Sequence, residues 1–562
     1  MMYPGERFYP KGVRWSDAIE RGTLPDLLST AAGDFGDRPA IEYRDRAISF
    51  SELETVVETT ASAFLGAGVG KGATIALFLG NSPDHPVNFF GALKAGARVA
   101  HLSPLDGERA LSHKLKDSGA RILVTSDLVT LLPTALKFLD QNLIDRLIIC
   151  EDDHWGAVGN PHTPIPDHPS VSTFAAFIEG AVRPSHWPDI SPEDIAVLQY
   201  TGGTTGLPKG AMLSHSNLTS AVSIYKVWNA PARRERLPVD RMICVLPLFH
   251  IYALTVVLLC SIRHGDVISL HQRFDAEAVM RDIEVKRATV FPGVPTMWIA
   301  IASLPDLDKR DMSSLMVAGS GGAPLPVEVA RIFERKTGLK IKSGWGMTET
   351  CSPGTSHPKD GPDKPGSIGL MLPGIELDVV SLDDPNKVLP AGETGEIRIK
   401  GPNITKGYLN RREETAQAFV SGDRFLTGDI GYMDADGYFF LVDRKKDMII
   451  SGGFNVYPQM IEQAIYEHPS VQEVIVIGIP DDYRGEAAKA FVKLRAGAGE
   501  FSLDDLKAAL AGKLGRHEMP AALEFVDELP RTSVGKLSRH ELRSREAVSR
   551  SETANGSTGG RS

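Results

Sequence analysis

Short apolar runs rich in β-branched residues alternate with longer helix-like stretches from about Ala73 onward. Continuous apolar runs of this length are typical of parallel strands that are buried on both faces. The pattern therefore predicts an α/β fold with largely parallel sheets. The predicted strands lie at residues 74–79, 121–124, 194–198, 241–246, 266–270 and 288–291.

The pattern changes at about residues 395–450, where paired apolar runs are joined by polar turns. Asp434-Ala-Asp-Gly437 separates two such runs and has the composition of a hairpin turn. The large domain is therefore expected to include an antiparallel portion. The apolar stretch 252–262 is too short for a membrane span, which needs about 20 residues, and predicts a buried helix.

A compact series of helices and strands follows the charged segment 443–447. Pro458 suits a first helical turn, and Ser502 with Asp505 forms a capping pair before apolar positions that continue to Leu514. This series predicts a small, mobile α+β domain at the C-terminal end of the large domain. The expected divisions are a large domain at 1–443, a hinge at 444–447, a small domain at 448–545 and a disordered, Ser- and Gly-rich tail at 546–562.

Composition narrows the classes of function. The chain has 562 residues with 42% hydrophobic and 23% charged residues, which is ordinary for globular proteins. Its net charge of −10, without long charged runs, argues against nucleic acid as a partner. The four cysteines form no Cys-x-x-Cys pair and the N-terminus lacks a secretory signal, so we expect a cytoplasmic protein without a transmembrane segment.

The segment 200–210 directly follows a predicted strand and has the chemistry of a phosphate-binding loop. Three glycines and three threonines precede Lys209, and together they offer backbone, hydroxyl and ammonium donors to a polyphosphate. The P-loop pattern fails, because Pro208 and Gly210 occupy the positions of its last glycine and its Ser/Thr. A flexible Gly/Thr surface loop is the alternative.

Three further segments carry weaker signals. Residues 344–350 place glycines around Trp345 and end in Thr348 and Glu349, a hydroxyl and a carboxylate that suit phosphate and Mg²⁺; a structural turn explains them equally well alone. Asp429 lies in a Thr-Gly-Asp turn, where an aspartate often only caps the turn. Lys536, near the chain end, is by itself a surface lysine.

The order and spacing of these segments are more specific than any one of them. Thr-Gly-Gly-Thr-Thr-Gly-Leu-Pro-Lys-Gly, Gly-Trp-Gly-Met-Thr-Glu, Thr-Gly-Asp, Asp-Arg-x-Lys-Asp with Ser-Gly-Gly-Phe-Asn-Val-Tyr-Pro, and a late Gly-Lys resemble the adenylate-forming superfamily of acyl-CoA synthetases, luciferases and adenylation domains. Over about residues 25–545 the sequence looks most like bacterial fatty-acyl-CoA ligases, and more loosely like their dicarboxylate (pimelate-type) branch.

The resemblance implies an enzyme that activates a medium- to long-chain aliphatic acid, mono- or dicarboxylic, with ATP and Mg²⁺ and transfers the acyl group to coenzyme A. It implies that Lys536, His250 and Thr348 are catalytic and that Glu349 binds the metal. It also implies that Trp345 stacks on adenine, at a position where many relatives have tyrosine. The residues implied to bind ATP or AMP are Thr201, Gly202, Gly203, Thr204, Thr205, Gly206, Lys209, Gly321, Gly322, Ala323, Pro324, Gly344, Trp345, Gly346, Met347, Asp429 and Arg444.

The same resemblance places the hinge at Lys446 and a pantetheine channel at Ser451, Gly452 and Gly453. It also implies that a protein acetyltransferase and a deacetylase act on Lys536. Leu254 stands where one long-chain relative has a gating tryptophan, so an acyl pocket of another shape is expected. Oligomeric state is not indicated by the sequence.

The sequence also bears on other classes of function. A hydrolase is disfavoured because Ala318 breaks the Gly-x-Ser-x-Gly pattern around Ser320. A nucleotide-binding protein without chemistry would not need Lys536, and amino-acid adenylation would need an aspartate that residues 249–252 lack. Loading of a carrier protein instead of CoA, and an aryl-CoA ligase, stay open as alternatives.

Overall fold

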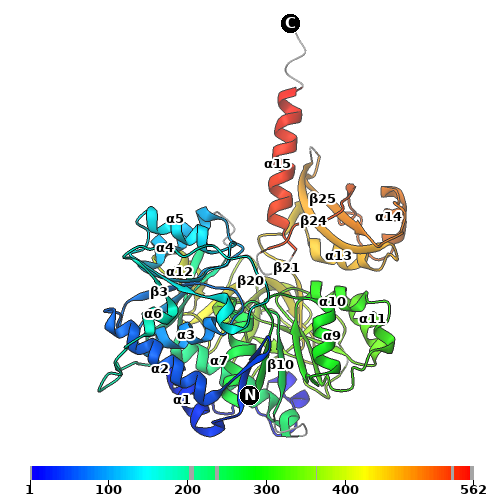
Figure 1. Ribbon diagram of the computed structural model, residues 1–562. Coiled ribbons are helices and arrows are strands. Elements are labelled where there is room, and N and C mark those ends of the chain that lie inside the picture. Colours follow the sequence, from blue (N-terminus) through cyan, green and yellow to red (C-terminus); the bar gives the residue numbers. More distant parts are fainter. Residues whose placement is uncertain are drawn as a thin grey trace.

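The computed structural model describes residues 3–201, 208–234, 239–362, 364–481, 483–532 and 537–556. A large N-terminal body is built on two extensive sheets with helices around them (Figure 1). A smaller C-terminal body with its own sheet lies beside α10 (Pro295–Ala302) and α11 (Val327–Thr337), and the terminal helix α15 (Arg539–Gly556) stands away from the molecule. This is the α/β architecture with a small C-terminal domain that the sequence predicts.

The first sheet is mainly parallel. Its strand order is β7 (Val171–Thr173), β6 (Arg146–Cys150), β5 (Ile122–Ser126), β3 (Thr74–Phe78), β4 (Arg98–His101), β8 (Ile195–Thr201) and β9 (Lys209–Ser214). Only the β8–β9 pair among these is antiparallel. Its connecting and flanking helices are α2 (Phe50–Gly66), α3 (Asp84–Lys94), α4 (Glu108–Ser118), α5 (Leu132–Asp140) and α6 (Phe174–Ile178).

The second sheet has a parallel half and an antiparallel half. The parallel half runs β14 (Ile341–Trp345), β13 (Val317–Ser320), β12 (Val290–Gly293), β10 (Arg241–Cys244), β11 (Val267–Leu270) and β1 (Pro39–Tyr43), with β2 (Arg46–Ser49) at its edge. The antiparallel half runs β17 (Glu376–Val380), β18 (Gly395–Lys400), β20 (Arg424–Met433), β21 (Phe439–Arg444), β16 (Ser367–Met371) and β15 (Thr355–Ser356), with β19 (Phe419–Val420) beside β20.

All of the predicted strands are confirmed, as is the predicted turn at Asp434–Gly437, which joins β20 to β21. The remaining helices of this body are α1 (Leu24–Phe35), α7 (His215–Arg234), α8 (Cys260–His264), α9 (Ala276–Glu284) and α12 (Arg412–Ala418). The apolar stretch 252–262 forms the π-helix η3 (Ala253–Leu259) followed by α8, and it is buried as expected. Among the described residues, no helix has the length and apolar character needed to cross a membrane.

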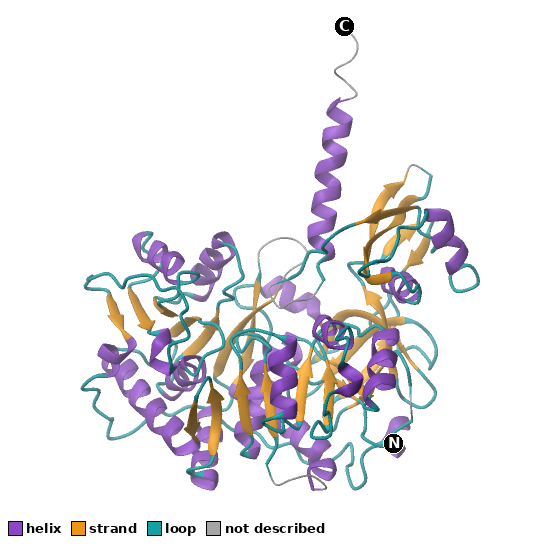
Figure 2. Cartoon of the chain, turned by 45° about the vertical axis from the view of Figure 1, so that its right-hand side comes forward, coloured by secondary structure: helices purple, strands orange, loops and turns teal. Residues whose placement is uncertain are grey.

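The C-terminal sheet has the order β23 (Phe454–Val456), β22 (Ile449–Ser451), β25 (Gly485–Leu494) and β24 (Val471–Asp481), with β26 (Ala522–Phe525) paired to β25. Figure 2 shows helices beside this sheet, which are α13 (Pro458–Tyr466) and α14 (Leu503–Leu510). A separate core here includes Ile461, Val476, Val492 and Leu506. Because this core is its own, the C-terminal body is a distinct structural unit.

Two ends of helices differ from the sequence prediction. Helix α14 stops at Leu510, before Leu514, because Gly512 adopts a positive φ of 80° that ends the turn. Helix α15 continues through Gly556, so residues 546–556 are helical where the sequence predicted a disordered tail. The residues that begin this segment, Glu546-Ala547-Val548-Ser549-Arg550, extend a helix that tertiary contacts start at Arg539, and composition alone did not reveal this.

Candidate active site

A deep cleft of about 2250 Å³ lies between the second sheet and the C-terminal body. It brings together residues from segments that are far apart in sequence. The predicted site residues that line it are Thr201, His250, Gly321, Gly322, Ala323, Pro324, Gly344, Trp345, Gly346, Met347, Thr348, Glu349, Asp429, Arg444 and Lys446. The cleft opens at the carboxyl ends of parallel strands β12, β13 and β14, which is where ligands bind in open α/β sheets.

Two glycines of the predicted nucleotide site are required by close approaches of other groups. A Cβ atom on Gly346 would lie 1.4 Å from the Ser352 carbonyl oxygen, so no side chain fits there. A Cβ atom on Gly321 would lie 2.9 Å from the Tyr252 ring. Both residues therefore line the cleft with bare glycine backbone.

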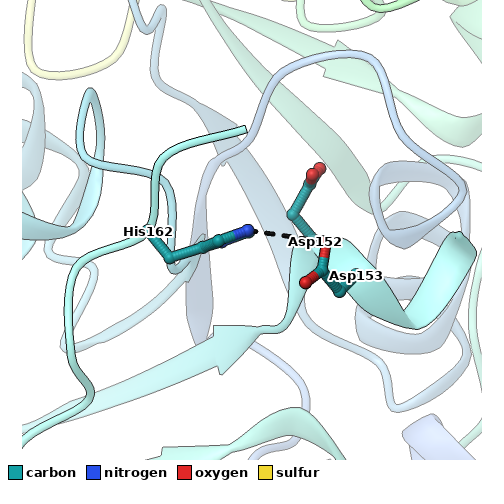
Figure 3. Close-up of side chains that lie close together, drawn as sticks. All are labelled: Asp152, Asp153 and His162. Carbon is teal, nitrogen blue, oxygen red and sulfur yellow. Dashed lines mark ion pairs between the residues drawn. The ribbon is translucent and has the colours of Figure 1, made fainter. Parts of the chain in front are cut away.

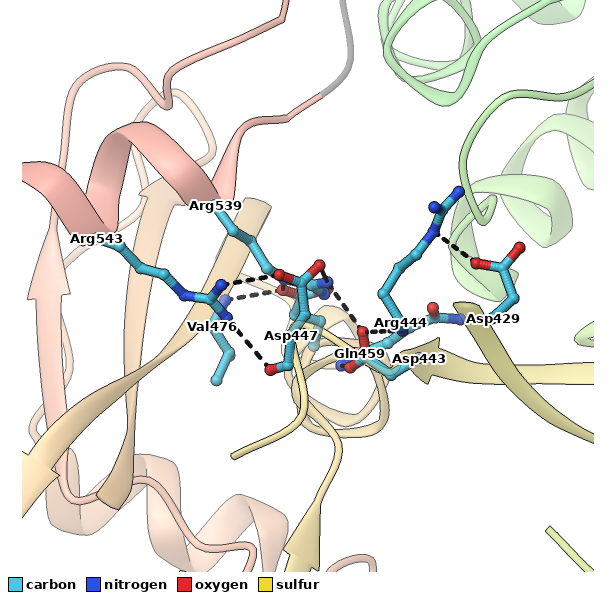
Figure 4. Close-up of polar contacts among 9 residues, drawn as sticks. Asp429, Asp443, Arg444, Asp447, Gln459, Val476, Arg539 and Arg543 are labelled. Carbon is cyan, nitrogen blue, oxygen red and sulfur yellow. Dashed lines mark hydrogen bonds and ion pairs between the residues drawn. The ribbon is translucent and has the colours of Figure 1, made fainter. Parts of the chain in front are cut away.

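Trp345, Asp429 and Arg444 form a connected polar group in the wall of the cleft. The Trp345 indole Nε1 donates to Asp429 Oδ2 at 2.7 Å. The Arg444 guanidinium pairs with Asp429 Oδ1, as Figure 4 shows. Asp429 and Arg444 are directly opposite each other on β20 and β21. The carboxylate of Asp429 raises the pKa of Arg444 above its usual value. Asp429, only 3% exposed, is thus held as an oriented anion.

Glu349 lies in the short 3₁₀ helix η5 (Thr348–Thr350) and is buried, with 5% of its surface exposed. The Tyr408 hydroxyl donates to Glu349 Oε1 at 2.8 Å. Burial raises the pKa of Glu349, and the hydrogen bond from Tyr408 opposes that shift. A buried carboxylate with one neutral donor is suited to a hard cation, which would supply the missing positive charge. The donor set therefore fits Mg²⁺.

The predicted phosphate loop connects the antiparallel strands β8 and β9. Thr201 and Lys209 face each other at its two ends, and Gly202–Gly206 lie outside the described residues. Lys209 does not line the cleft; its Nζ lies 5.6 Å from the Tyr408 ring centroid and 4.0 Å from Glu414 Oε1. Tyr408 therefore contacts both the loop lysine and the buried Glu349.

A buried network supports the segment that carries His250. Gln199 Nε2 donates to the Phe249 carbonyl at 2.8 Å, and Gln199 Oε1 lies 3.0 Å from His101 Nδ1. The Tyr252 backbone N–H donates to His250 Nδ1 at 3.3 Å. Burial lowers the pKa of His101 to about 4, so its ring is neutral at pH 7. The segment that carries His250 is thus held at the edge of the cleft by Gln199, which is itself bound to a neutral His101.

Sequence reasoning missed several residues of this site, namely Tyr408, Gln199, His101 and Tyr252. Tyr408 and His101 come from outside every recognised motif, so no local signal points to them. Gln199 did carry a signal, because a glutamine inside an otherwise apolar buried strand needs hydrogen-bond partners.

A cluster of charges joins the hinge segment to the C-terminal body. Arg539 pairs with Glu462 Oε2 at 2.7 Å, with Asp443 at 3.1 Å and with Asp447 at 3.4 Å (Figure 4). Arg543 adds a second pair with Asp447 at 2.9 Å. Lys446 lies among these residues with an exposed side chain that lines the cleft. Helix α15 is therefore tied to both ends of the predicted hinge.

Other predicted residues lie apart from the cleft in this arrangement. Gly452 and Gly453, with φ of 58° and 83°, form the tight turn between β22 and β23, and Ser451 ends β22; none of the three lines the cleft. Lys536 lies outside the described residues.

A group of Asp152, Asp153 and His162 lies close together outside the cleft (Figure 3). The Arg44 guanidinium pairs with Asp152 at 2.7 Å, and His162 lies 3.2 Å from Asp127. These side chains therefore pair with other protein groups near the end of β6.

Comparison with known proteins identifies this arrangement. The family description "AMP-binding enzyme" matches residues 28–409, and "AMP-binding enzyme C-terminal domain" matches residues 460–536. The chain is 36% identical over 534 residues to the long-chain-fatty-acid–CoA ligase of Bacillus subtilis (strain 168), covering 93% of this chain and 94% of that protein.

Solved structures with bound nucleotide are similar throughout. ATP-bound MatB from Rhodopseudomonas palustris matches with a TM-score of 0.82 and 30% identity, over 93% of this chain and 99% of that one. O-succinylbenzoate coenzyme A synthetase (MenE) from Bacillus subtilis, in complex with ATP and magnesium ion, matches with a TM-score of 0.76 and 27% identity, over 92% of this chain and 99% of that one.

Proposed function

The chain belongs to the family of AMP-binding enzymes, and we propose on this premise that its substrate is a medium- to long-chain aliphatic carboxylic acid. It is an AMP-forming acyl-CoA synthetase that uses ATP, Mg²⁺ and coenzyme A. The acid is first joined to AMP and then transferred to the thiol of CoA.

The observation that carries the proposal is the meeting of three groups in one cleft: the Glu349 carboxylate, the Asp429–Arg444 pair, and the bare backbone at Gly321 and Gly346. A hard cation site, an oriented anion suited to ribose hydroxyls, and a flat surface suited to a base are the parts that a nucleoside triphosphate needs. Their convergence favours ATP chemistry over a structural role.

In the first step, a substrate carboxylate oxygen attacks the α-phosphorus of ATP, and the bond to the β-phosphate oxygen breaks to release pyrophosphate. In the second, the CoA thiol loses its proton and attacks the acyl carbonyl carbon, and AMP leaves. Both steps gather negative charge at one place, so oriented donors and cations there lower the barrier.

Residues of the cleft have the following roles in the proposed reaction. The Thr348 hydroxyl donates a hydrogen bond to the α-phosphate, and His250 orients the reacting carboxylate. Asp429 and Arg444 bind the ribose, Trp345 stacks on the adenine, and the backbone from Gly321 to Pro324 and from Gly344 to Met347 surrounds the base. When bound, Mg²⁺ would be held by Glu349 and would neutralise phosphate charge. The loop from Thr201 to Lys209 holds the outer phosphates.

The C-terminal body supplies the remaining parts of the proposal. Lys536 bridges the carboxylate and the α-phosphate in the first step. Rotation of residues 448–545 about the hinge at 444–447 then brings Ser451, Gly452 and Gly453 to the pantetheine path. The separate core of the C-terminal body supports such a movement, because that body can rotate as an intact unit.

The proposal also covers regulation at Lys536 and location in the cell. Acetylation of Lys536 by a protein acetyltransferase removes its charge and stops adenylation, and a deacetylase restores it. The protein acts in the cytoplasm, where ATP and CoA are available and its four cysteines stay reduced.

The test is a screen of purified protein with ATP, Mg²⁺ and CoA against aliphatic acids of graded length, with AMP, pyrophosphate and acyl-CoA as readouts. We expect all three products with medium to long chains, and adenylation reduced by orders of magnitude in Lys536→Ala. Formation of ADP or inorganic phosphate alone would contradict the adenylation chemistry. Acyl transfer only to a carrier protein would contradict CoA as the acceptor.

A further inference from the structure

Two separate sheets meet at the cleft, and each carries part of the first reaction step. Strand β8 of the first sheet leads into the predicted phosphate loop at Thr201, whereas His250 lies in the turn that follows β10 of the second sheet. The carboxylate that His250 orients must reach the α-phosphorus of an ATP whose outer phosphates the loop holds. A shift of about 1 Å between the two sheets would misalign the reacting atoms and slow this step.

A buried hydrogen bond joins the two sheets beside His250. The His250 N–H donates to the Pro247 carbonyl at 2.9 Å and closes the turn. The Phe249 carbonyl, next to His250, accepts from Gln199 Nε2 at 2.8 Å. Gln199 belongs to β8, so this bond links the first sheet directly to the turn. Gln199 and Phe249 are both buried, and the bond is therefore stronger than it would be in water.

A second side-chain amide of the first sheet binds the same turn. Asn81 lies just after β3, and its Oδ1 accepts from the Leu248 N–H at 2.9 Å. Its Nδ2 donates to the Leu246 carbonyl at 3.0 Å. Asn81 therefore holds the start of the turn, and Gln199 holds the residue next to His250.

Gln199 also lies close to the predicted phosphate loop. It is two positions before Thr201 on β8, which corresponds to about 7 Å of strand. Residues two apart point to the same face of a strand, and both of these residues line the cleft. Asn81 does not line the cleft. Gln199 is thus the residue that ties His250 most directly to the loop.

The orientation of the Gln199 amide follows from its partners. A carbonyl only accepts hydrogen bonds, so the Phe249 carbonyl faces the amide nitrogen, and Gln199 Oε1 faces His101 Nδ1 at 3.0 Å. The proton of the neutral His101 ring must therefore be on Nδ1. Burial lowers the pKa of His101 to about 4, so the neutral ring is the form present at pH 7.

Helix α3 in turn fixes the ring of His101. This ring stacks on His85 and on Phe89, with ring centroids 5.0 Å and 5.7 Å away. His85 and Phe89 both belong to α3 and are fully buried. The His101 ring cannot turn away from Gln199 without breaking this packing, so it is a fixed donor to the amide oxygen.

We propose that Gln199 is a positioning residue for adenylation, which holds His250 in register with the phosphate loop, and that His101 keeps the Gln199 amide in the required orientation. This inference rests on the proposed function and concerns its first step. The outer phosphates leave as pyrophosphate in that step, so the alignment has no part in the later attack of the CoA thiol. Loss of Gln199 should therefore slow adenylation selectively.

Gln199→Met keeps most of the side-chain volume and removes both hydrogen bonds. We expect pyrophosphate release in a single turnover to slow about tenfold or more, while formation of acyl-CoA from supplied acyl-adenylate changes less than about twofold. Asn88→Leu is the control, because Asn88 is a buried amide that does not line the cleft. It should lower the Tm and leave both steps unchanged. Equal slowing of the two steps by Gln199→Met would overturn the inference.

A double-mutant cycle shows whether Gln199 acts through His250. In the His250→Ala variant, the further change Gln199→Met should slow adenylation less than about twofold, because the group that it positions is already absent. If the two effects multiplied, Gln199 would act independently of His250 and the inference would be wrong.

His101 offers a test that does not depend on the folding of Gln199→Met. His101→Asn keeps a nitrogen donor at the same number of bonds from the backbone, whereas His101→Leu removes it. Adenylation should be about tenfold faster in His101→Asn than in His101→Leu. Equal rates in these two variants would contradict the role of His101. Absence of AMP and pyrophosphate from the unaltered enzyme with every aliphatic acid would instead refute the proposed function.

Discussion

Asp429 is the residue on which two predicted motifs meet, because the indole of Trp345 and the guanidinium of Arg444 bind its two oxygens. Many relatives are expected to have tyrosine in place of Trp345. The indole here acts as a donor as well as a flat surface, since its N–H orients the carboxylate that we assign to the ribose.

Replacing Trp345 by phenylalanine keeps an aromatic face and removes the N–H. Asp429 Oδ2 then loses a buried donor, which costs about 1–3 kcal/mol at a charged group. We expect KM for ATP to rise about tenfold with a smaller change in kcat. Trp187→Phe, which is remote from the cleft, is the control. An unchanged KM for ATP would show that Asp429 is oriented by Arg444 alone.

Tyr408 offers a second test at this scale, because its hydroxyl donates to Glu349. Tyr408→Phe removes that donor, so the hydrogen bond no longer opposes the raised pKa of the buried Glu349. We expect the Mg²⁺ concentration for half-maximal adenylation to change several-fold, and kcat to fall about tenfold. Glu349→Gln is the comparison and should be more severe. If Tyr408→Phe changed neither quantity, the hydrogen bond would have no part in cation binding.

The motifs predicted Glu349 and Asp429 as candidates, but not the partners that orient them. Glu349 and Tyr408 are 59 positions apart, and Trp345 and Asp429 are 84 apart. Spacing along the chain carries no information about contacts of that range. Only the folded chain, which brings these residues together at the cleft, determines them.

At the scale of elements, apolar runs predicted the parallel strands well, because burial on both faces leaves a plain signal. They could not predict the π-helix η3, since a segment that is apolar all round has no preferred face. They also extended α14 to Leu514, because periodic leucines outweighed the stop signal at Gly512.

The start of α14 was predicted correctly. The contribution of its capping box to the free energy of unfolding can be measured. Ser502 Oγ accepts from the Asp505 N–H at 3.1 Å, and Asp505 Oδ2 accepts from the Ser502 N–H at 3.0 Å. Ser502→Ala should destabilise the C-terminal body by about 1 kcal/mol. Urea unfolding measures the loss, and adenylation should be unaffected because α14 is remote from the cleft. If the adenylation rate fell in proportion to the loss of stability, α14 would not be independent of the cleft.

At the scale of the molecule, Glu462 links stability to pH. Burial raises the pKa of Glu462 from 4.5 to about 7, despite its pairing with Arg539. The folded state therefore binds a proton more tightly than the unfolded state. The free energy of unfolding contributed by this group is complete below about pH 4.5 and is lost as pH rises to about 7.

Glu462→Gln cannot titrate, so it should lack this slope. We expect the Tm of the variant, measured relative to that of the unaltered protein, to rise between pH 5 and pH 8. Loss of the ion pair to Arg539 lowers the Tm of the variant at both pH 5 and pH 8. The informative quantity is therefore the slope of Tm against pH. Glu467→Gln, on the exposed end of the same helix, is the control. Parallel curves for variant and unaltered protein would contradict the raised pKa.

The largest expected movement is a rotation of the C-terminal body about Lys446, which no local pattern could reveal beyond a short charged connector. Asp443 precedes that residue, and it contacts the Gln459 N–H at 2.8 Å and Arg539 at 3.1 Å, both beyond the hinge. These contacts hold the present arrangement and must break on rotation. Among the described residues no backbone hydrogen bond uses the Lys446 N–H, so proline removes none here.

Lys446→Pro fixes φ near −65° and should therefore prevent the rotation without unfolding the protein. Pyrophosphate release in a single turnover should survive, because it needs only one arrangement. Formation of acyl-CoA from supplied acyl-adenylate should fall at least tenfold, because CoA reaches the acyl group only in the rotated arrangement of the C-terminal body. Lys446→Ala removes the charge and keeps the torsional freedom, so it should retain both steps. Equal slowing of the two steps by proline, or slowing of neither, would place the hinge elsewhere.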